Sequence, residues 1–130
     1  MLTQGRGLAH ISIFVKDIEI TNDFYCNKLG FKKIWERDQN TADGLVRSSF
    51  LELGNLQLEI LQIENVTYPA DGCIQHIAIG VEDIEKAYQE IKAMGIECTE
   101  IAADAGVLTG SKWFCFNGPD GEHLEMNHVD

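Results

Sequence analysis

The sequence lacks the features that mark membrane-bound, secreted and nucleic-acid-binding proteins. None of its apolar stretches approaches the roughly 20 residues of a membrane-spanning helix, and residues 1–7 have no apolar core of a secretory signal. Lysine and arginine total 10 against 21 acidic residues, for a formal net charge of −11. Nucleic acid and anionic membrane surfaces both need a basic face. We therefore expect a cytoplasmic protein with neither as a partner.

Closely spaced cysteine pairs are also absent. The four cysteines are scattered over the chain at positions 26, 73, 98 and 115, with no C-x-x-C motif. This spacing argues against a zinc knuckle and against a disulfide framework, and reduced thiols are expected. With 130 residues, 45% of them hydrophobic, the chain is long enough for one ordinary domain or for two half-size units that share a core.

The first half of the chain predicts one helix and four strands. Residues 8–15 alternate apolar and other side chains with the period of a half-buried strand. Asp17 stands at a helix N-cap position and Gly30 at the corresponding C-terminal position. Further strands are expected at 31–36, 46–53 and 56–63, with a polar loop over 37–45.

The second half predicts the same order of elements after a linker at 64–73. A strand at 74–81 is followed by a helix over 83–94, in which Ile84, Ala87, Tyr88, Ile91 and Met94 form one stripe. Strands follow at 96–101, 112–117 and 122–128, with a loop over 102–111. The halves match at an offset of 66 residues. The sequence therefore predicts two βαβββ units, residues 1–66 and 67–130.

A histidine and a glutamate recur in both units at the same spacing. His10 and Glu59 are 49 residues apart, and so are His76 and Glu125. In each first strand the Ile and Val face should pack on the helix, which leaves the histidine on the opposite face. Either pair alone is more often structural. Packing explains why a duplicated unit keeps Ile and Val, but it does not explain why both copies carry His and Glu.

Two imidazoles and two carboxylates that face one cavity need a compensating charge, because an unpaired buried carboxylate costs several kcal/mol. No Lys or Arg recurs at matching positions, whereas one divalent metal would supply the charge. The four residues, His10, Glu59, His76 and Glu125, suit Ni²⁺ or Zn²⁺ best, with Co²⁺ or Mn²⁺ as alternatives.

Three segments, LAHISIFVKDIEITNDFYCNKLGF, IQHIAIGVEDIEKAYQEIKAMGI and FNGPDGEHLEM, resemble the vicinal oxygen chelate superfamily. This superfamily contains glyoxalase I, methylmalonyl-CoA epimerase, fosfomycin-resistance enzymes and ring-cleaving dioxygenases. The resemblance spans nearly the whole chain. It implies the α+β glyoxalase/bleomycin resistance/dioxygenase fold, in which two βαβββ repeats form a curved mixed sheet around a metal site. It also implies a homodimer, with the ligands drawn from one chain or from two.

The four ligands are similar to those of glyoxalase I, the lactoylglutathione lyase of methylglyoxal detoxification. That similarity implies a metal-dependent lyase for a small-molecule substrate. The enzyme would isomerise the thiohemiacetal of a 2-oxoaldehyde through a metal-bound enediolate, with the metal as Lewis acid. By the family's pattern Glu125 is the catalytic base and Glu59 its pseudo-symmetric partner.

Two positions depart from glyoxalase I. Phe14 stands where an Arg usually grips glutathione, and Ile63 stands where an Asn is usual. An epimerase or isomerase acting on another chelated carbonyl, such as a CoA thioester, is therefore an alternative. A small-molecule-binding module of the resistance type is another. Trp113 and His123 are further candidates for the substrate pocket, and His123 shares a strand face with Glu125.

Overall fold

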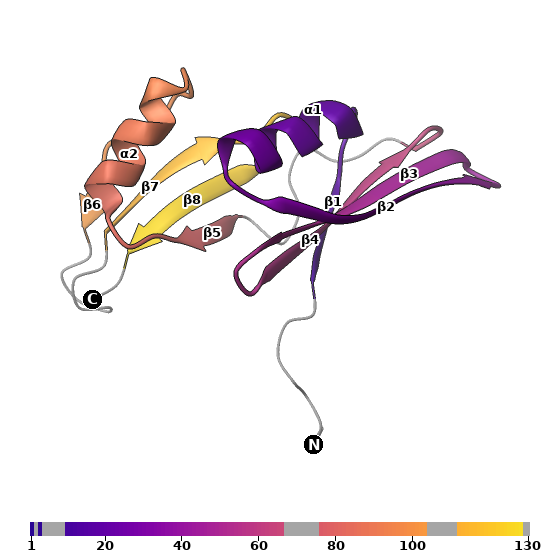
Figure 1. Cartoon of the computed structure of the whole chain (residues 1–130), viewed down its shortest axis with the longest axis horizontal. Coiled ribbons are helices and arrows are strands. Elements are labelled where there is room, and N and C mark those ends of the chain that lie inside the picture. The colour runs from indigo at the N-terminus through magenta and orange to yellow at the C-terminus, as the bar shows by residue number, and fades with distance from the viewer. Residues whose placement is uncertain (2, 4–9, 67–75, 104–111, 129–130) are drawn as a thin grey trace. The chain divides into compact units, whose positions relative to one another are not determined.

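A computed structural model describes residues 1, 3, 10–66, 76–103 and 112–128 of the chain (Figure 1). The chain divides into two compact units, Met1–Tyr68 and Pro69–Asp130, called unit 1 and unit 2 below. No helix in the described part is long and apolar enough to cross a membrane.

Unit 1 is a four-stranded mixed sheet with one helical segment. Strand β1 is parallel to β4, and β4, β3 and β2 follow as antiparallel neighbours, so the order is β1-β4-β3-β2. The helical segment packs against β3 and β4. The elements are β1 (Ile11–Phe14), α1 (Ile18–Asp23), a π-helical turn η1 (Phe24–Lys28), β2 (Lys32–Thr41), β3 (Gly44–Leu53) and β4 (Leu56–Ile63).

Unit 2 repeats this topology. Its strand order is β5-β8-β7-β6, again with one parallel pair, β5 and β8. The elements are β5 (Ile77–Gly80), α2 (Ile84–Ala93), β6 (Ala102–Ala103), β7 (Lys112–Asn117) and β8 (His123–His128). The predicted α+β class and both βαβββ units are confirmed, as two four-stranded mixed sheets.

The helical segment formed by α1 and η1, and the helix α2, begin and end where the sequence predicts. The Asp17 carboxylate accepts hydrogen bonds from the backbone N–H groups of Glu19 and Ile20, at 2.9 and 3.2 Å. The Asp83 carboxylate accepts a hydrogen bond from the backbone N–H of Lys86 at 2.9 Å. Each aspartate thus satisfies backbone N–H groups that have no partner within the first turn of the helix. Gly30 and Gly95 follow the helices with φ of +81° and +77°. This left-handed conformation favours glycine.

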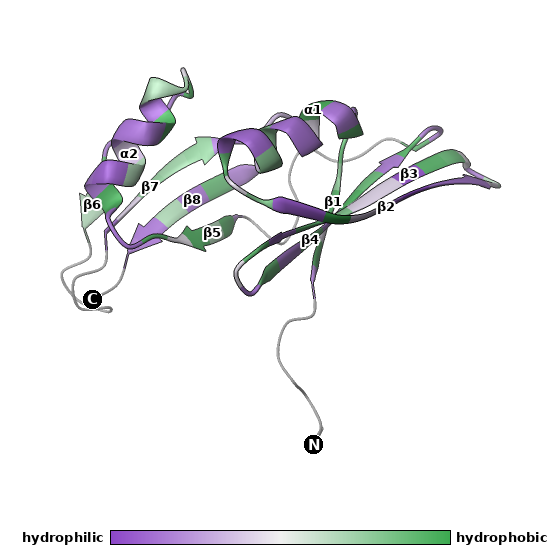
Figure 2. Cartoon of the chain, viewed as in Figure 1, coloured by the Kyte–Doolittle hydropathy of each residue, from purple (hydrophilic) through white to green (hydrophobic). Residues whose placement is uncertain are grey.

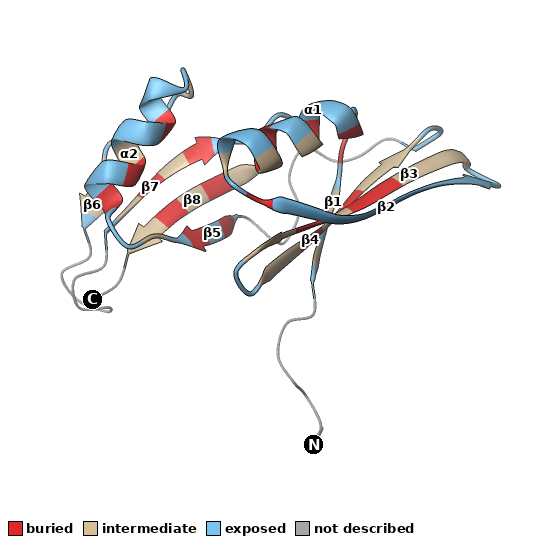
Figure 3. Ribbon diagram, viewed as in Figure 1, coloured by how far each residue is buried: buried red, intermediate tan, exposed pale blue. Residues whose placement is uncertain are grey.

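Each unit buries its apolar side chains between its sheet and its helix, as the red residues of Figure 3 show. The strand residues on the opposite face of each sheet are half-buried or exposed. In unit 2, Ile84, Ala87 and Ile91 are buried as the helical stripe predicts, but Met94 is 37% exposed. Met94 is the residue that ends α2, and it therefore lies beyond the packed stripe.

The polar loop expected at 37–45 is wrong. Strand β2 continues to Thr41 and β3 begins at Gly44, so a long hairpin occupies most of this segment. All ten residues of β2 are exposed, and Figure 2 shows this edge strand mostly in hydrophilic colours. From Arg37 to Thr41 the strand is polar on both faces, so no apolar alternation reveals it. Cross-strand partners Asp38 and Arg47 hold the hairpin by an ion pair at 3.3 Å.

The strand expected at 96–101 is also wrong, because only Ala102 and Ala103 pair regularly with β7. Thr99 explains the difference. Its backbone N–H donates to the Cys115 carbonyl at 2.9 Å. In return, the Cys115 N–H donates to the Thr99 hydroxyl, also at 2.9 Å. A side-chain oxygen thus takes the place of a ladder carbonyl, and the backbone pairing is interrupted. Parts of the expected strands at 8–15 and 74–81 lie outside the described residues.

Candidate metal centre

The first strand of each unit presents its histidine on the face that points away from the helix. In β5, Ile77 and Ile79 are buried while Ala78 and Gly80 are exposed. In β1, Ser12 and Phe14 are exposed between half-buried isoleucines. Both histidines are exposed and directly precede their strands. Since side chains alternate along a strand, His10 and His76 belong to the exposed faces.

In unit 2, histidine and glutamate converge. Ala78 of β5 is the register partner of Glu125 of β8, which brings the side chain of His76 beside the glutamate. The His76 Nε2 and Glu125 Oε2 atoms lie 3.7 Å apart. Metal–ligand distances of about 2.1 Å would span this gap at an angle of roughly 120°. The separation is therefore compatible with two ligands of one divalent cation.

Other side chains hold Glu125 in place. The Asn127 amide donates to Glu125 Oε1 at 3.0 Å, and the Cys115 thiol lies 4.0 Å from Oε2. The glutamate side chain is only 14% exposed. Burial raises the pKa of the Cys115 thiol, and the charge of Glu125 raises that pKa further. Cys115 therefore stays protonated, and its S–H group can face the carboxylate.

In unit 1 the glutamate is held by a different residue. Ser12 is the register partner of Glu59, and its hydroxyl donates to Glu59 Oε1 at 2.8 Å. His10 lies two residues before Ser12, on the same face. The His10 ring makes an edge contact with Phe50, at 5.3 Å between ring centres. Phe50 is itself the β3 register partner of Glu59, so histidine and glutamate flank the same aromatic ring.

The donor types fit a divalent metal. Among the described residues no Lys or Arg forms an ion pair with Glu59 or Glu125. The described ranges contain no cluster of three or more ligating side chains, and in unit 2 one His–Glu pair, His76 and Glu125, comes together. Imidazole nitrogen and carboxylate oxygen suit Zn²⁺, Ni²⁺, Co²⁺ and Mn²⁺. A single centre with all four ligands requires both pairs to meet, and that stays a prediction.

The four expected pocket residues lie on the same faces as the candidate ligands. Phe14 is 48% exposed at the end of β1. Ile63 lies on β4 four residues after Glu59 and is half-buried. In unit 2, Trp113 is the register partner of Asn127, and His123 Nδ1 lies 3.2 Å from the Asn117 side-chain oxygen. Each unit thus has two of these residues on the sheet face that carries its glutamate.

The sequence did not single out the residues that hold the glutamates. Ser12 is 47 residues from Glu59 and meets it only through strand register. Asn127 shares the strand face of Glu125 by alternation, but its hydrogen bond to the carboxylate is seen only in the structure. Most strand aromatics lie in a core, and Phe50 and Trp35 stand on strands β3 and β2. Trp35 is instead 43% exposed, and both residues lie on the face of unit 1 that carries Glu59.

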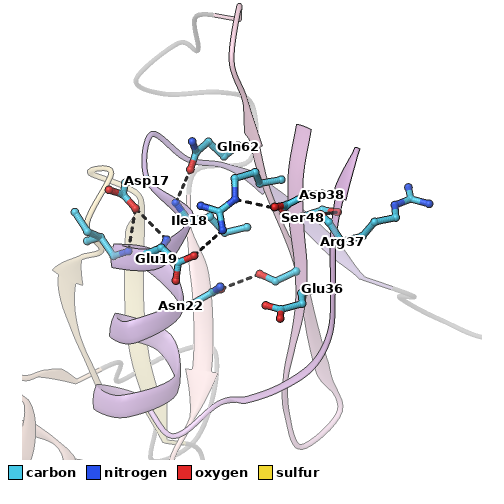
Figure 4. A network of polar contacts seen from close by, with 12 residues as sticks. Asp17, Ile18, Glu19, Asn22, Glu36, Arg37, Asp38, Ser48 and Gln62 are labelled. Carbon is cyan, nitrogen blue, oxygen red and sulfur yellow. Dashed lines mark hydrogen bonds and ion pairs between the residues drawn. The ribbon is translucent and has the colours of Figure 1, made fainter. Parts of the chain in front are cut away.

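The opposite face of unit 1 carries a polar network that attaches the helix to the sheet (Figure 4). Arg47 donates to Glu19 of α1 at 2.6 Å and to Asp38 of β2 at 3.3 Å. The backbone N–H of Ile18 donates to the Gln62 side chain at 2.8 Å. These contacts fix the start of α1 on β3 and β4. They have no part in the candidate metal centre.

Three comparisons place the chain among known proteins. The protein YwkD of Bacillus subtilis (strain 168), which is uncharacterized, is 31% identical over 125 residues, covering 93% of this chain and 95% of that protein. The crystal structure of a glyoxalase family protein from Enterococcus faecalis is 29% identical, with a TM-score of 0.75 over 94% of this chain and 97% of that one.

The fosfomycin resistance protein FosX from Listeria monocytogenes, solved with Mn(II) and sulfate, has the same fold. It is 22% identical, with a TM-score of 0.72 over 98% of this chain and 95% of that chain. A family model that covers glyoxalases, bleomycin resistance proteins and dioxygenases matches residues 7–126. The family name covers enzymes as well as resistance proteins. The chain belongs to the Glyoxalase/Bleomycin resistance protein/Dioxygenase superfamily.

Proposed function

We propose that the protein is a divalent-metal-dependent lyase of the glyoxalase I type, acting on the thiohemiacetal of a 2-oxoaldehyde. The observation that carries the proposal is the convergence of His76 and Glu125 at 3.7 Å on an exposed sheet face. The matching pair of unit 1, His10 and Glu59, completes the ligand set. A cation held by these four residues would supply Lewis-acid polarisation of two adjacent substrate oxygens.

Glu125 is the proposed catalytic base. It takes the proton from the carbon that is bonded to sulfur and returns it to the neighbouring carbon. The hydroxyl proton of the first carbon passes to the oxygen of the neighbouring ketone, so the first carbon becomes a thioester carbonyl and the ketone becomes an alcohol, with no external oxidant or reductant. The amide of Asn127 occupies Oε1, which directs the other oxygen, Oε2, toward His76. Glu59 is the pseudo-symmetric carboxylate, fixed by Ser12.

A second function, epimerisation or isomerisation of another chelated carbonyl such as a CoA thioester, is favoured by two side chains. Phe14 and Ile63 are apolar where glyoxalase I usually has its glutathione anchors, and both lie on the face that carries Glu59. These side chains favour a carrier thiol other than glutathione. Proton exchange at the α-carbon of a CoA thioester, without turnover of any thiohemiacetal, would identify this second function.

Metal binding tests the proposal directly. Metal-free protein is titrated with Ni²⁺, Zn²⁺, Co²⁺ and Mn²⁺ by calorimetry, and each loaded form is assayed with methylglyoxal and several thiols. We expect one metal per site, with binding lost in Glu59→Ala and Glu125→Ala. Two matched controls, His128→Gln and Glu90→Gln, should bind as the unsubstituted protein does. His128 lies on the other face of β8, and Glu90 is exposed on α2.

Unchanged metal stoichiometry in Glu59→Ala and Glu125→Ala would contradict the proposal. An unsubstituted protein that binds no metal, but takes up an apolar small molecule, would instead indicate a resistance-type binding module. Light scattering on the same samples tests the proposed homodimer, for which a mass of twice 14.5 kDa is expected.

A further inference from the structure

A row of aromatic side chains leads away from the candidate ligand His10 on the exposed face of unit 1. The His10 ring contacts Phe50 at 5.3 Å between ring centres, and Phe50 contacts Trp35 at 5.8 Å, both edge to face. The Arg37 guanidinium carbon lies 5.3 Å from the centre of the Trp35 ring. We call Phe50, Trp35 and Arg37 the aromatic row. It begins beside a candidate metal ligand and ends in a cation.

A β-bulge in the edge strand β2 brings the row together. Lys33 pairs with Leu51 and Trp35 pairs with Phe50, so Ile34 is the extra residue. Without it, strict alternation would place Ile34 opposite Phe50 and turn Trp35 toward the helix. Because of the bulge, Trp35 and Arg37 lie on the face that carries Glu59.

The row has no evident role in folding. The core of unit 1 lies on the other side of the sheet, where Leu51 and Leu58 are 0% exposed, whereas Trp35 is 43% exposed. Unit 2 shows that the fold does not require an aromatic ring here. Its glutamate, Glu125, has Cys115 as the β7 register partner, where Glu59 has Phe50.

Arg37 differs from Arg47 in its ion pairs within the part of the chain that the structure describes. Arg47 forms ion pairs with Glu19 and Asp38. Among the described residues no carboxylate pairs with the Arg37 guanidinium, although acidic residues outnumber basic ones by 21 to 10. Figure 4 shows the Arg37 side chain directed away from Glu19 and Asp38. An unpaired guanidinium stacked on an aromatic ring is well suited to a carboxylate or a phosphate.

We propose that the aromatic row binds the part of the substrate beyond its reacting oxygens, namely a planar apolar segment that ends in an anionic group. This inference rests on the proposed function. Glu59, Phe50 and Trp35 lie on three adjacent strands in register. With strands about 4.8 Å apart and a rise of about 3.3 Å per residue, the Cα atoms of Glu59 and Arg37 lie about 12 Å apart. The Phe50 and Trp35 rings are inclined at 74° to each other, so the planar segment would stack on one ring and contact the edge of the other, and the anion would meet Arg37.

Matched chelating probes test the inference. Benzohydroxamate offers two adjacent oxygens for the metal, and its para position carries a carboxylate, a phosphonate or a neutral carboxamide. Dissociation constants are measured by calorimetry on Zn²⁺- or Ni²⁺-loaded protein. We expect at least one anionic probe to bind about tenfold more tightly than the carboxamide, as one charge-assisted contact predicts. Whichever anion binds more tightly identifies the chemical class of the substrate's end group.

Single substitutions assign the effect to the row. Arg37→Gln should reduce the preference for the anion to within about twofold and leave carboxamide binding unchanged. Trp35→Leu should weaken all three probes about tenfold, because each loses an aromatic contact. Arg47→Gln is the matched control, since Arg47 lies on the helix face, and it should retain the full preference.

Three outcomes would overturn the inference. If all probes bind equally well and only with metal present, the row does not recognise an anion, while the proposed metal function stands. If no probe binds the metal-loaded protein, the proposed function fails and the inference fails with it. If Trp35→Leu changes the molecular mass in solution but not probe affinity, the row is a contact between subunits.

Discussion

The hydrogen bond from Ser12 to Glu59 offers a sharp test of the candidate metal centre. Its donor and acceptor atoms are 2.8 Å apart on the exposed face. Ser12→Ala removes this donor, so the Glu59 carboxylate can rotate away from its ligating orientation. Loss of a residue that orients a ligand typically lowers metal affinity by about 10- to 100-fold. Because Ser12 is exposed, we expect the lower end of that range, about tenfold, which corresponds to about 1.4 kcal/mol.

Ser49 provides a matched control on the opposite face of the same sheet. Its hydroxyl donates to the side-chain oxygen of Asn22 at 2.8 Å, and Ser49 is 0% exposed. Ser49→Ala should destabilise the fold by about 1–2 kcal/mol, since a partly buried acceptor is left without its donor. It should not change metal affinity. Ser12→Ala should do the reverse, with a free energy of unfolding within about 0.5 kcal/mol of the unsubstituted protein.

Two measurements separate these effects. Competition with a chromogenic chelator gives the metal dissociation constant of each variant. Urea unfolding of the metal-free proteins gives their stability. If Ser12→Ala binds metal within twofold of the unsubstituted protein, Glu59 is not a ligand oriented by Ser12. If both variants lose affinity in proportion to their loss of stability, the effect on metal is a consequence of folding alone.

Three further predictions concern specificity, reactivity and stability. Phe14→Arg combined with Ile63→Asn supplies the polar anchors usual in glyoxalase I. In steady-state assays the double variant should have a higher kcat/KM for the glutathione adduct relative to other thiol adducts. An unchanged ratio of kcat/KM values would count against a pocket at these positions. In metal-free protein at pH 8, Glu125→Gln should speed alkylation of Cys115 several-fold, because removal of the adjacent charge lowers the pKa of the thiol. The alkylation rate is followed by mass spectrometry. An unaltered rate would disprove the effect of the Glu125 charge on the Cys115 thiol. Ile91→Ala, at a residue only 4% exposed, should cost about 2–5 kcal/mol in urea unfolding, and a loss below about 1 kcal/mol would contradict the packing of α2.

The repeat could be predicted because the two halves of the chain match at an offset of 66 residues. The faces of the first strands could be predicted because they depend on the local alternation of apolar residues. Ile77 and Ile79 are buried and Ala78 and Gly80 are exposed, as period-two alternation requires. The helix caps Asp17 and Asp83 could be predicted for a similar reason, since a carboxylate bonds to N–H groups only two or three residues away.

The edge strand β2 could not be predicted. Its Arg37–Asn40 stretch is solvent-exposed on both faces, so it has the composition of a loop. Its pairing depends on β3, and cross-strand contacts of this kind leave no period in one strand alone. The bulge at Ile34 is equally hidden, although it decides which face Trp35 joins.

The candidate site was predictable in part. Equal 49-residue spacings predict that each histidine lies beside its glutamate, and in unit 2 His76 Nε2 and Glu125 Oε2 lie 3.7 Å apart. The spacing within a unit contains no information on how two units pack, so a four-ligand centre does not follow from it. The hydrogen bonds that orient the glutamates were not predictable either, because Ser12 meets Glu59 across two strands whereas Asn127 meets Glu125 along one strand, so the repeat contains no common partner.

Both units contain a His–Glu pair, but the side chains around the two pairs differ. The two units would therefore have different roles in the proposed enzyme. The Cys115 thiol and the Asn127 amide lie beside Glu125, and the Glu125 side chain is only 14% exposed. Such a sheltered carboxylate suits proton transfer, because few water molecules compete for it. The Ser12 hydroxyl and the Phe50 ring lie beside Glu59. Phe50 contacts the exposed Trp35, and Trp35 contacts Arg37. In the proposed enzyme, Glu125 of unit 2 would therefore transfer the proton, and the aromatic row of unit 1 would recognise the substrate.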